Sequence, residues 1–211
     1  MTGIINFETF LLAGILLNLA PGNDTIFILS RSIAQGKRAG IMSVLGIATG
    51  SVIHTSFAAF GLSIIIAESI VAFSILKYAG AAYIVYIGYK MLSDQSHPEI
   101  DIQSKKRRMD PKKVYRDAVI TNLFNPKVAL FFIAFLPQFI NPAYKNTVLP
   151  FMLLGITFTI TGALWCFILA NFASVIADKI KDNNKVSSYI NNTCGLLLIG
   201  LGLKLAFSAR K

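Results

Sequence analysis

The chain has 211 residues, of which 55% are hydrophobic and 14% are charged, and its mean hydropathy is +0.63. A soluble globular domain carries about 25% charged residues, so this composition excludes an ordinary soluble domain and indicates a protein whose solvent is lipid. The formal net charge is +10, but the basic residues lie between apolar segments, which argues against a nucleic-acid partner.

Six apolar segments are each long enough to cross a hydrocarbon core of about 30 Å. They cover residues 8–30, 40–66, 70–92, 117–140, 148–172 and 188–207. The first segment has one early charge, Glu8, no basic region before it and no small-residue cleavage site after it. We interpret it as a retained helix and not as a signal peptide.

The first segment is interrupted by the sequence NLAPGND, residues 18–24. A proline inside a helix removes a backbone donor and clashes with the preceding turn, so Pro21 followed by Gly22 predicts a kink or a break. Carbonyl groups freed in lipid must face protein or a water-filled cavity. Asp24 lies in the same segment, and a mid-membrane acid costs about 2.5–3.5 kcal/mol, which predicts that it faces the bundle interior.

The second segment contains His54 and the small-residue pair Gly46 and Gly50. The glycine spacing predicts close helix packing, within a compact bundle or across a homodimer. His54 has two open interpretations, a structural interhelical hydrogen bond or a contact with a proton or substrate. No Cys or carboxylate lies at ligand spacing from it, so we predict neither a metal site nor a cofactor.

A basic segment, 93–116, follows the third apolar segment and divides the chain into residues 1–92 and 117–211. The fourth apolar segment then repeats the interruption of the first, with NLFNPK at residues 122–127. Each half contains three helices, so an odd number of crossings turns the second half upside down. The predicted fold is therefore an all-α integral membrane protein of six transmembrane helices, built as two inverted three-helix repeats.

Basic residues alternate between the loops. The first, third and fifth loops are basic, the second has no Lys or Arg, and the fourth has only Lys145. The positive-inside rule then places the basic loops in the cytoplasm and the N-terminus outside. The tail residues Arg210 and Lys211 fall outside in this scheme, which counts against it, and a five-helix arrangement would bring them inside.

Matched proline interruptions in the two halves of a membrane protein indicate a transport site near the bilayer midplane; the alternative is a pair of packing kinks with no ligand. Asp24 and Lys127 follow the two interruptions, and they have two open interpretations. They form a structural ion pair, or they bind the ammonium and carboxylate groups of a zwitterionic amino acid. A buried carboxyl group disfavours its charged form, which leads to the hypothesis that Asp24 exchanges protons. The other polar candidates are Asn18, Asn23, His54, Asn122 and Asn125, and the residues that shape the breaks are Pro21, Gly22 and Pro126.

Two stretches together resemble the lysine-exporter family of amino-acid efflux permeases, in its threonine/homoserine-efflux branch. They are NLAPGNDTIFILSRSIAQGKRAGIMSVLGIATGSVIHTSFAAFGL, residues 18–62, and NLFNPKVALFFIAFLPQF, residues 122–139. The resemblance implies a small exporter of the bacterial inner membrane, driven by the proton gradient. Asn23 departs from the family pattern, which often has a second proline at this place, so the local break is expected to be milder here.

The predicted function is secondary active export of amino acids or close derivatives, such as homoserine, threonine or leucine, coupled to protons. The expected partners are the amino-acid substrate, protons and the lipid bilayer, with a homodimer as an option. The alternatives are an ion or heavy-metal exporter on a related scaffold, a membrane enzyme or electron-transfer protein, and a non-transporting scaffold in which Asp24 and Lys127 neutralise each other.

Overall fold

The computed structural model describes residues 2–62, 70–93, 109–141, 143–144, 146–173 and 184–207. Within these residues the regular structure is helical, apart from one isolated antiparallel bridge between Ile4 and Ile140. The expectation of an all-α fold is confirmed for the part of the chain that is described.

The first half contains α1 (Phe7–Leu19), α2 (Asn23–Gln35), α3 (Lys37–Phe57), the π-helical turn η1 (Ala58–Leu62) and α5 (Ile70–Ser93). The second half contains α6 (Pro111–Leu123), α7 (Pro126–Leu130), the π-helical turn η2 (Phe131–Phe135), the 3₁₀ turn η3 (Leu136–Phe139), α8 (Val148–Asn171) and α10 (Asn184–Phe207). The helix α6 begins at Pro111, earlier than the expected 117, and most of the predicted linker, 94–108, lies outside the described residues.

Two continuous helices are long and apolar enough to cross a membrane, α3 with η1 and α8. Two bent pairs pass the same test together, α1 with α2 at 46° and α6 with the helix that follows Pro126 at 49°. The described residues therefore contain two candidate spans, or up to four if each bent pair is one span. The helices α5 and α10 occupy the other two expected segments, and residues 192–203 of α10 form a shorter apolar stretch.

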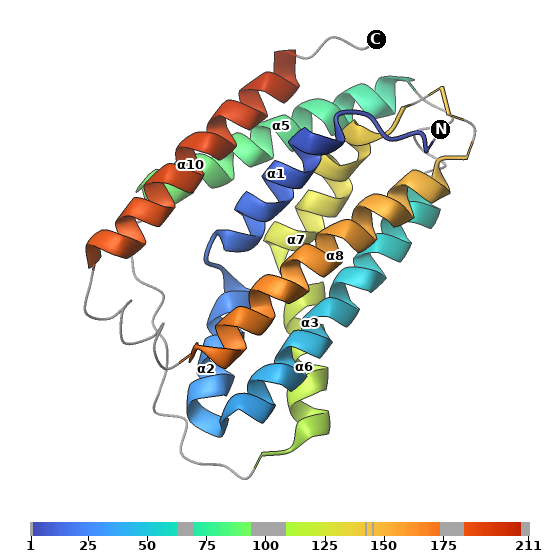
Figure 1. Ribbon diagram of the computed structural model, residues 1–211. Helices are drawn as coiled ribbons and strands as arrows, with labels where there is room; N and C mark the ends of the chain where they lie inside the picture. The colour runs from blue at the N-terminus through green and yellow to red at the C-terminus, as the bar shows by residue number, and fades with distance from the viewer. Residues whose placement is uncertain are drawn as a thin grey trace.

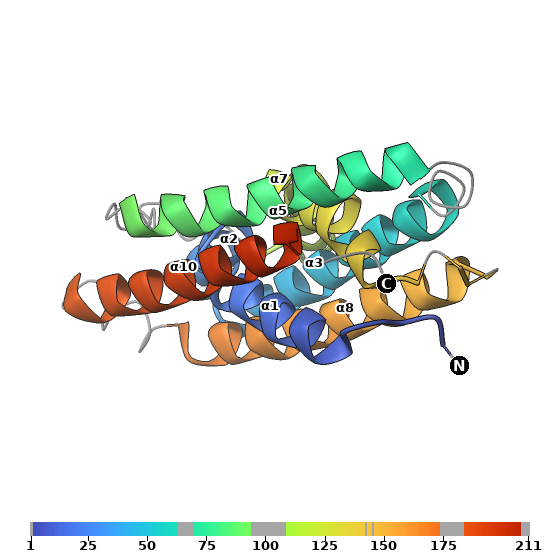
Figure 2. The same cartoon turned by 90° about the horizontal axis from the view of Figure 1, so that it is seen from above.

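The two broken spans lie side by side with their breaks at a similar depth (Figure 1). The helices α1 and α7 share the half of the bundle that contains the N-terminus, and α2 and α6 share the other half. The helix α3 packs against both α6 and α8, while α5 and α10 pack along each other. Seen from above, the α5–α10 pair lies on one side of the bundle and α8 on the opposite side (Figure 2).

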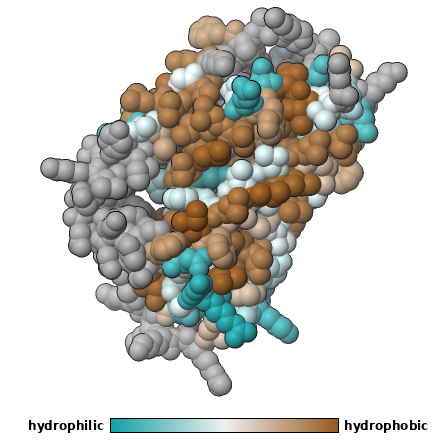
Figure 3. Space-filling model, viewed as in Figure 1, coloured by the Kyte–Doolittle hydropathy of each residue, from teal (hydrophilic) through white to brown (hydrophobic). Residues whose placement is uncertain are grey.

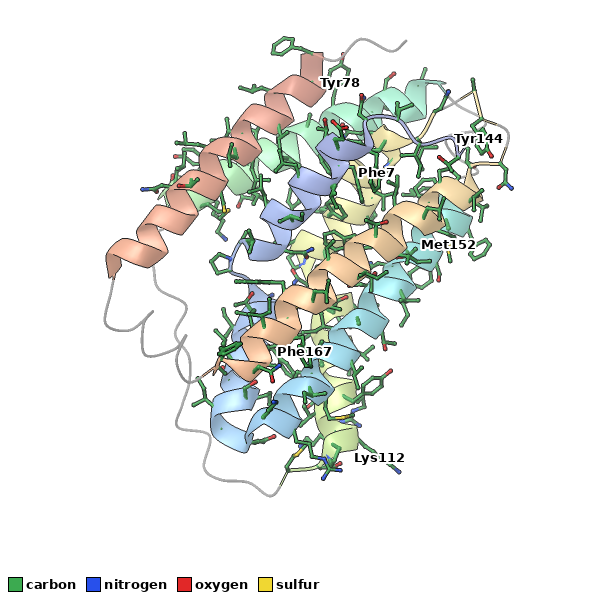
Figure 4. All side chains as sticks on the ribbon, in the orientation of Figure 1. Phe7, Tyr78, Lys112, Tyr144, Met152 and Phe167 are labelled. Atoms are coloured by element: carbon green, nitrogen blue, oxygen red, sulfur yellow. The ribbon has the colours of Figure 1, made fainter. Side chains whose placement is uncertain are left out.

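Basic side chains gather where α2 ends and α6 begins, and we call this the basic end. Lys112 marks it in Figure 4, whereas Phe7 and Tyr144 lie at the opposite end. The visible face between the ends is largely apolar, and hydrophilic residues gather at both ends (Figure 3). The basic residues of α2, of the start of α3 and of the start of α6 are Arg31, Lys37, Arg38, Lys112, Lys113 and Arg116.

A cluster of aromatic rings fills the half of the bundle away from the basic end. The rings of Phe131 and Phe158 stack with centroids 4.2 Å apart, and Phe10 meets Phe139 edge to face at 5.3 Å. Most of its members are fully buried. We call it the phenylalanine cluster; its members are Phe10, Phe131, Phe132, Phe135, Phe139 and Phe158.

Gly50 lets α6 approach α3 closely, and its replacement by alanine is expected to destabilise the bundle. A Cβ atom at Gly50 would lie 2.5 Å from the Asn122 Oδ1 atom, so the helices would have to separate, at a cost of about 1–3 kcal/mol. Thermal unfolding in detergent measures this. Gly200→Ala is the control, because a Cβ there meets nothing within 4 Å and alanine favours the helix. An equal or higher Tm for Gly50→Ala would contradict the packing argument.

Candidate functional site

Proline produces both helix breaks by acting on the residue before it. A proline ring disfavours the helical conformation of the preceding residue. Accordingly, Ala20 before Pro21 is extended with ψ 120°, and Asn125 before Pro126 is extended with ψ 107°. The breaks therefore fall one residue ahead of each proline, at matching depth in the two spans.

The chain restarts its helices differently after the two breaks. Asn125 is the N-cap of α7, where its Oδ1 atom accepts a hydrogen bond from the Lys127 backbone N–H at 3.1 Å. Pro126 occupies the first helical turn, where its missing N–H costs nothing. Gly22 is the N-cap of α2 without a side-chain bond, and Asn23 beside it is exposed. The NPK motif is therefore a helix start that places Lys127 at a fixed position.

Asp24 is joined to the second broken span through an asparagine. Its Oδ2 atom accepts a hydrogen bond from Asn122 Nδ2 at 2.8 Å, and Asn122 is 1% exposed. The backbone oxygen of Asn122 lies 3.3 Å from Nε2 of His54, whose ring stacks on Phe132. His54 thus makes an interhelical contact, and Asn122 links it to the acid.

Lys127 reaches across to the other broken span. Its Nζ atom donates a hydrogen bond to the Ala20 carbonyl at 2.7 Å, and this carbonyl belongs to the open C-terminus of α1. A helix C-terminus carries a partial negative charge that favours a cation. The ion pairs found among the described residues are Arg31–Asp117 and Arg116–Asp117, so Asp24 and Lys127 do not pair with each other in this conformation.

The two breaks enclose a small pocket, which we call the break pocket. Its volume is about 40 Å³, which is room for a few water molecules and not for an amino acid. Two of its lining residues each have a buried acceptor atom without a hydrogen-bond partner, Asp24 Oδ1 and Asn122 Oδ1. Because unpaired buried acceptors are costly, the pair fits a guest that carries N–H or O–H donors. The polar residues that line the pocket are Asn18, Asp24, Thr25, Ser51, Asn122, Asn125, Lys127 and Thr159.

A second pocket lies between α5 and the two breaks, and we call it the α5 pocket. Its volume is about 520 Å³, within the range of small-molecule sites. Gly22, Asn125 and Lys127 line both pockets and form the wall between them. The other described residues that line the α5 pocket are Ala20, Pro21, Asn23, Ile26, Tyr83, Tyr86, Ile87, Lys90, Met91, Pro126 and Leu130.

Comparison with known proteins identifies the family. The family described as LysE type translocator matches residues 15–209. The chain therefore belongs to the LysE type translocator family. The translocator is thus a multi-pass membrane protein of a transporter family, which confirms the resemblance seen in residues 18–62 and 122–139.

Several curated relatives match the translocator along nearly its whole length. An uncharacterised membrane protein, YrhP, of Bacillus subtilis (strain 168) is 32% identical over 197 residues, covering 90% of this chain and 93% of the relative. The leucine efflux proteins of Salmonella choleraesuis (strain SC-B67) and Salmonella typhimurium (strain LT2) are each 30% identical over 209 residues, covering 97% of this chain and 96% of the relative. No solved structure matches.

The predicted site residues of the translocator divide between the two pockets. Asn23, Pro21 and Pro126 line the α5 pocket only, and His54 lines neither. Asn18 lines the break pocket and donates to Thr161 Oγ1 at 3.3 Å. The candidates brought together at the break pocket are Asn18, Gly22, Asp24, Asn122, Asn125 and Lys127.

Sequence reasoning missed several polar residues of the translocator. Ser51 lies one helical turn before His54, a spacing that places it on the same face of α3. The sequence could therefore have predicted Ser51 as a residue facing the bundle interior. Tyr83 donates to the Pro126 carbonyl at 3.3 Å, and Arg31 pairs with Asp117 at 3.2 Å near the basic end. Neither of these pairs has a local sequence signal, because each joins segments that are far apart in the chain.

Proposed function

We propose that this translocator exports amino acids or close derivatives in exchange for protons, across the bacterial inner membrane. The observation that carries the proposal is the break pocket, where an acid with an unpartnered oxygen and a lysine lie on opposite broken spans. The names of the Salmonella relatives, leucine efflux proteins, support an amino-acid substrate.

The charges of the break pocket complement a zwitterion. The ammonium group of an amino acid has three donors, and Asp24 Oδ1 and Asn122 Oδ1 offer two free acceptors. The ammonium group of Lys127 also has three donors, of which one is bonded to Ala20. The remaining two are available to a substrate carboxylate. We propose that the substrate binds with its two charged groups on these residues.

Proton exchange follows from competition at Asp24. A carboxylate that holds a proton no longer attracts an ammonium group, so the substrate and a proton exclude each other there. On the outer side a proton replaces the substrate, and on the inner side its release lets the next substrate bind. One proton then moves inward for each amino acid that moves outward.

The membrane arrangement that supports this cycle is six spans in two inverted halves, with the N-terminus outside. The residues of the basic end support a cytoplasmic position for that end. Rocking of one half against the other would open the break pocket to each side in turn. In this proposal, α1 and α2 of the first half and α6 and α7 of the second half provide the residues that contact the substrate.

An export assay tests the proposal. Purified translocator in liposomes loaded with labelled leucine, threonine, homoserine or lysine is given an inward proton gradient, with and without an uncoupler. We expect export of at least one of them that increases with the gradient and is lost with the uncoupler. Gradient-independent export would contradict the proton coupling, and absence of export for every amino acid tested would contradict the function.

A further inference from the structure

The α5 pocket provides space that the break pocket lacks. The break pocket, at about 40 Å³, accommodates charged head groups only, whereas the α5 pocket has about 520 Å³. Gly22 and Lys127 line both. A Cβ atom at Gly22 would lie 3.5 Å from Lys127 Nζ, so the Lys127 side chain lies against Gly22 in the wall between the two spaces, with Asn125 as its third member. A substrate with its head group on Asp24 and Lys127 therefore has one adjoining space for its side chain.

Part of the wall of the α5 pocket is apolar. Ile87 of α5 is 9% exposed, and Leu130 is 36% exposed at the end of α7. Ile26 of α2 and Met91 of α5 add to this part of the wall, beside two tyrosines of α5. Burial of an apolar group against such a wall contributes about 0.8 kcal/mol per CH₂. The wall therefore favours side chains of the size and polarity of leucine or methionine.

Among the described residues, the charged side chains that line the α5 pocket are all positive. Lys90 and Lys127 line it, and no Asp or Glu is among its described lining residues. Lys90 lies in the last turn of α5 and is exposed. A substrate with a cationic side chain would bring a like charge beside these ammonium groups, which is unfavourable.

We propose that the α5 pocket is the side-chain subsite of the translocator, and that it accepts uncharged apolar side chains and rejects cationic ones. This inference rests on the proposed function. Leu130 and Ile87 set the size of the side chain that fits, and Lys90 is the residue that excludes lysine and arginine. The adjoining wall of Gly22, Asn125 and Lys127 links the subsite to the head-group contacts.

Competition among substrates tests the size part of the proposal. Liposomes that hold equal amounts of labelled alanine, leucine, phenylalanine and lysine are assayed for the ratio of exported products. Leu130→Trp is expected to reduce leucine and phenylalanine export about tenfold relative to alanine. Ile87→Ala is expected to increase phenylalanine relative to leucine. The control is Leu164→Trp, on the exposed face of α8, which should leave the ratios unchanged.

The same assay tests the charge part. Lys90→Glu is expected to increase lysine export relative to leucine about fivefold, the size of an exposed ion-pair effect. Lys112→Glu makes the same charge change at the basic end, outside both pockets, and should not alter the ratio. If the unmodified chain exports no amino acid, the proposed function fails. If it exports them, but Leu130→Trp, Ile87→Ala and Lys90→Glu each change the export of every substrate by the same factor, the α5 pocket does not bind the side chain and the proposed subsite is contradicted.

Discussion

Replacement of Asp24 by asparagine is expected to abolish proton-driven export while the protein still inserts in the membrane. Asparagine keeps the shape of the side chain and an oxygen that accepts from Asn122, but it carries no negative charge and takes up no proton. Loss of one partner of a buried charged pair costs about 2–5 kcal/mol, which is a reduction of at least about 30-fold in affinity. Export from loaded liposomes under a proton gradient measures the effect.

Asp110→Asn is the matched control for Asp24→Asn. Asp110 is the N-cap of α6 and accepts hydrogen bonds from the backbone N–H groups of Lys112 and Lys113, a role that asparagine fills equally well. The same chemical change outside the pocket should leave export intact. Normal gradient-dependent export by the Asp24→Asn variant would remove Asp24 from the proposed mechanism.

Replacement of Lys127 by methionine is expected to remove recognition of the substrate carboxylate. The unmodified protein should prefer leucine strongly over leucinamide, which lacks the carboxylate, whereas Lys127→Met should lose this preference. A charged partner removed from a buried site changes affinity by about 2–5 kcal/mol. The ratio of leucine to leucinamide export measures recognition separately from stability, because the lost bond to Ala20 affects both substrates alike. Lys127→Arg keeps the charge and should keep part of the preference.

An unchanged leucine preference in Lys127→Met would contradict carboxylate binding by this lysine. The double variant Asp24→Leu/Lys127→Leu tests whether the two charges only neutralise each other. Retained export by the double variant would remove both residues from the proposed substrate site.

The positions of the breaks follow from the sequence because proline acts on its neighbours. Pro21 and Pro126 determine the conformation of Ala20 and Asn125 without help from the rest of the fold. The cap made by Asn125 was equally open to prediction, since asparagine before proline is a standard helix start. The local half of the site is therefore encoded within a few residues.

The hydrogen-bond partners of Asp24 and Lys127 across the bundle could not be predicted from the sequence. Asp24 bonds Asn122, which is 98 positions away, and Lys127 bonds a backbone carbonyl 107 positions away. The pattern of charges suggested that the acid and the lysine meet. Instead, Asp24 accepts from the Asn122 side chain, and Lys127 donates to the Ala20 carbonyl that the first break leaves free. The start of α6 was missed because Pro111 to Arg116 carry no apolar run, whereas Asp110 and Pro111 form a helix start.

The phenylalanine cluster makes the break pocket more tightly packed on one side than on the other. On one flank, between the breaks and α5, the site adjoins the larger α5 pocket, whereas away from the basic end it meets the six packed rings. Parting those rings would expose a large aromatic area to water, so we expect opening toward that end to be the costlier step. With the basic end in the cytoplasm, as proposed, the cluster closes the site toward the cell exterior. The proposed transport cycle then has to part these rings each time a substrate is released outside.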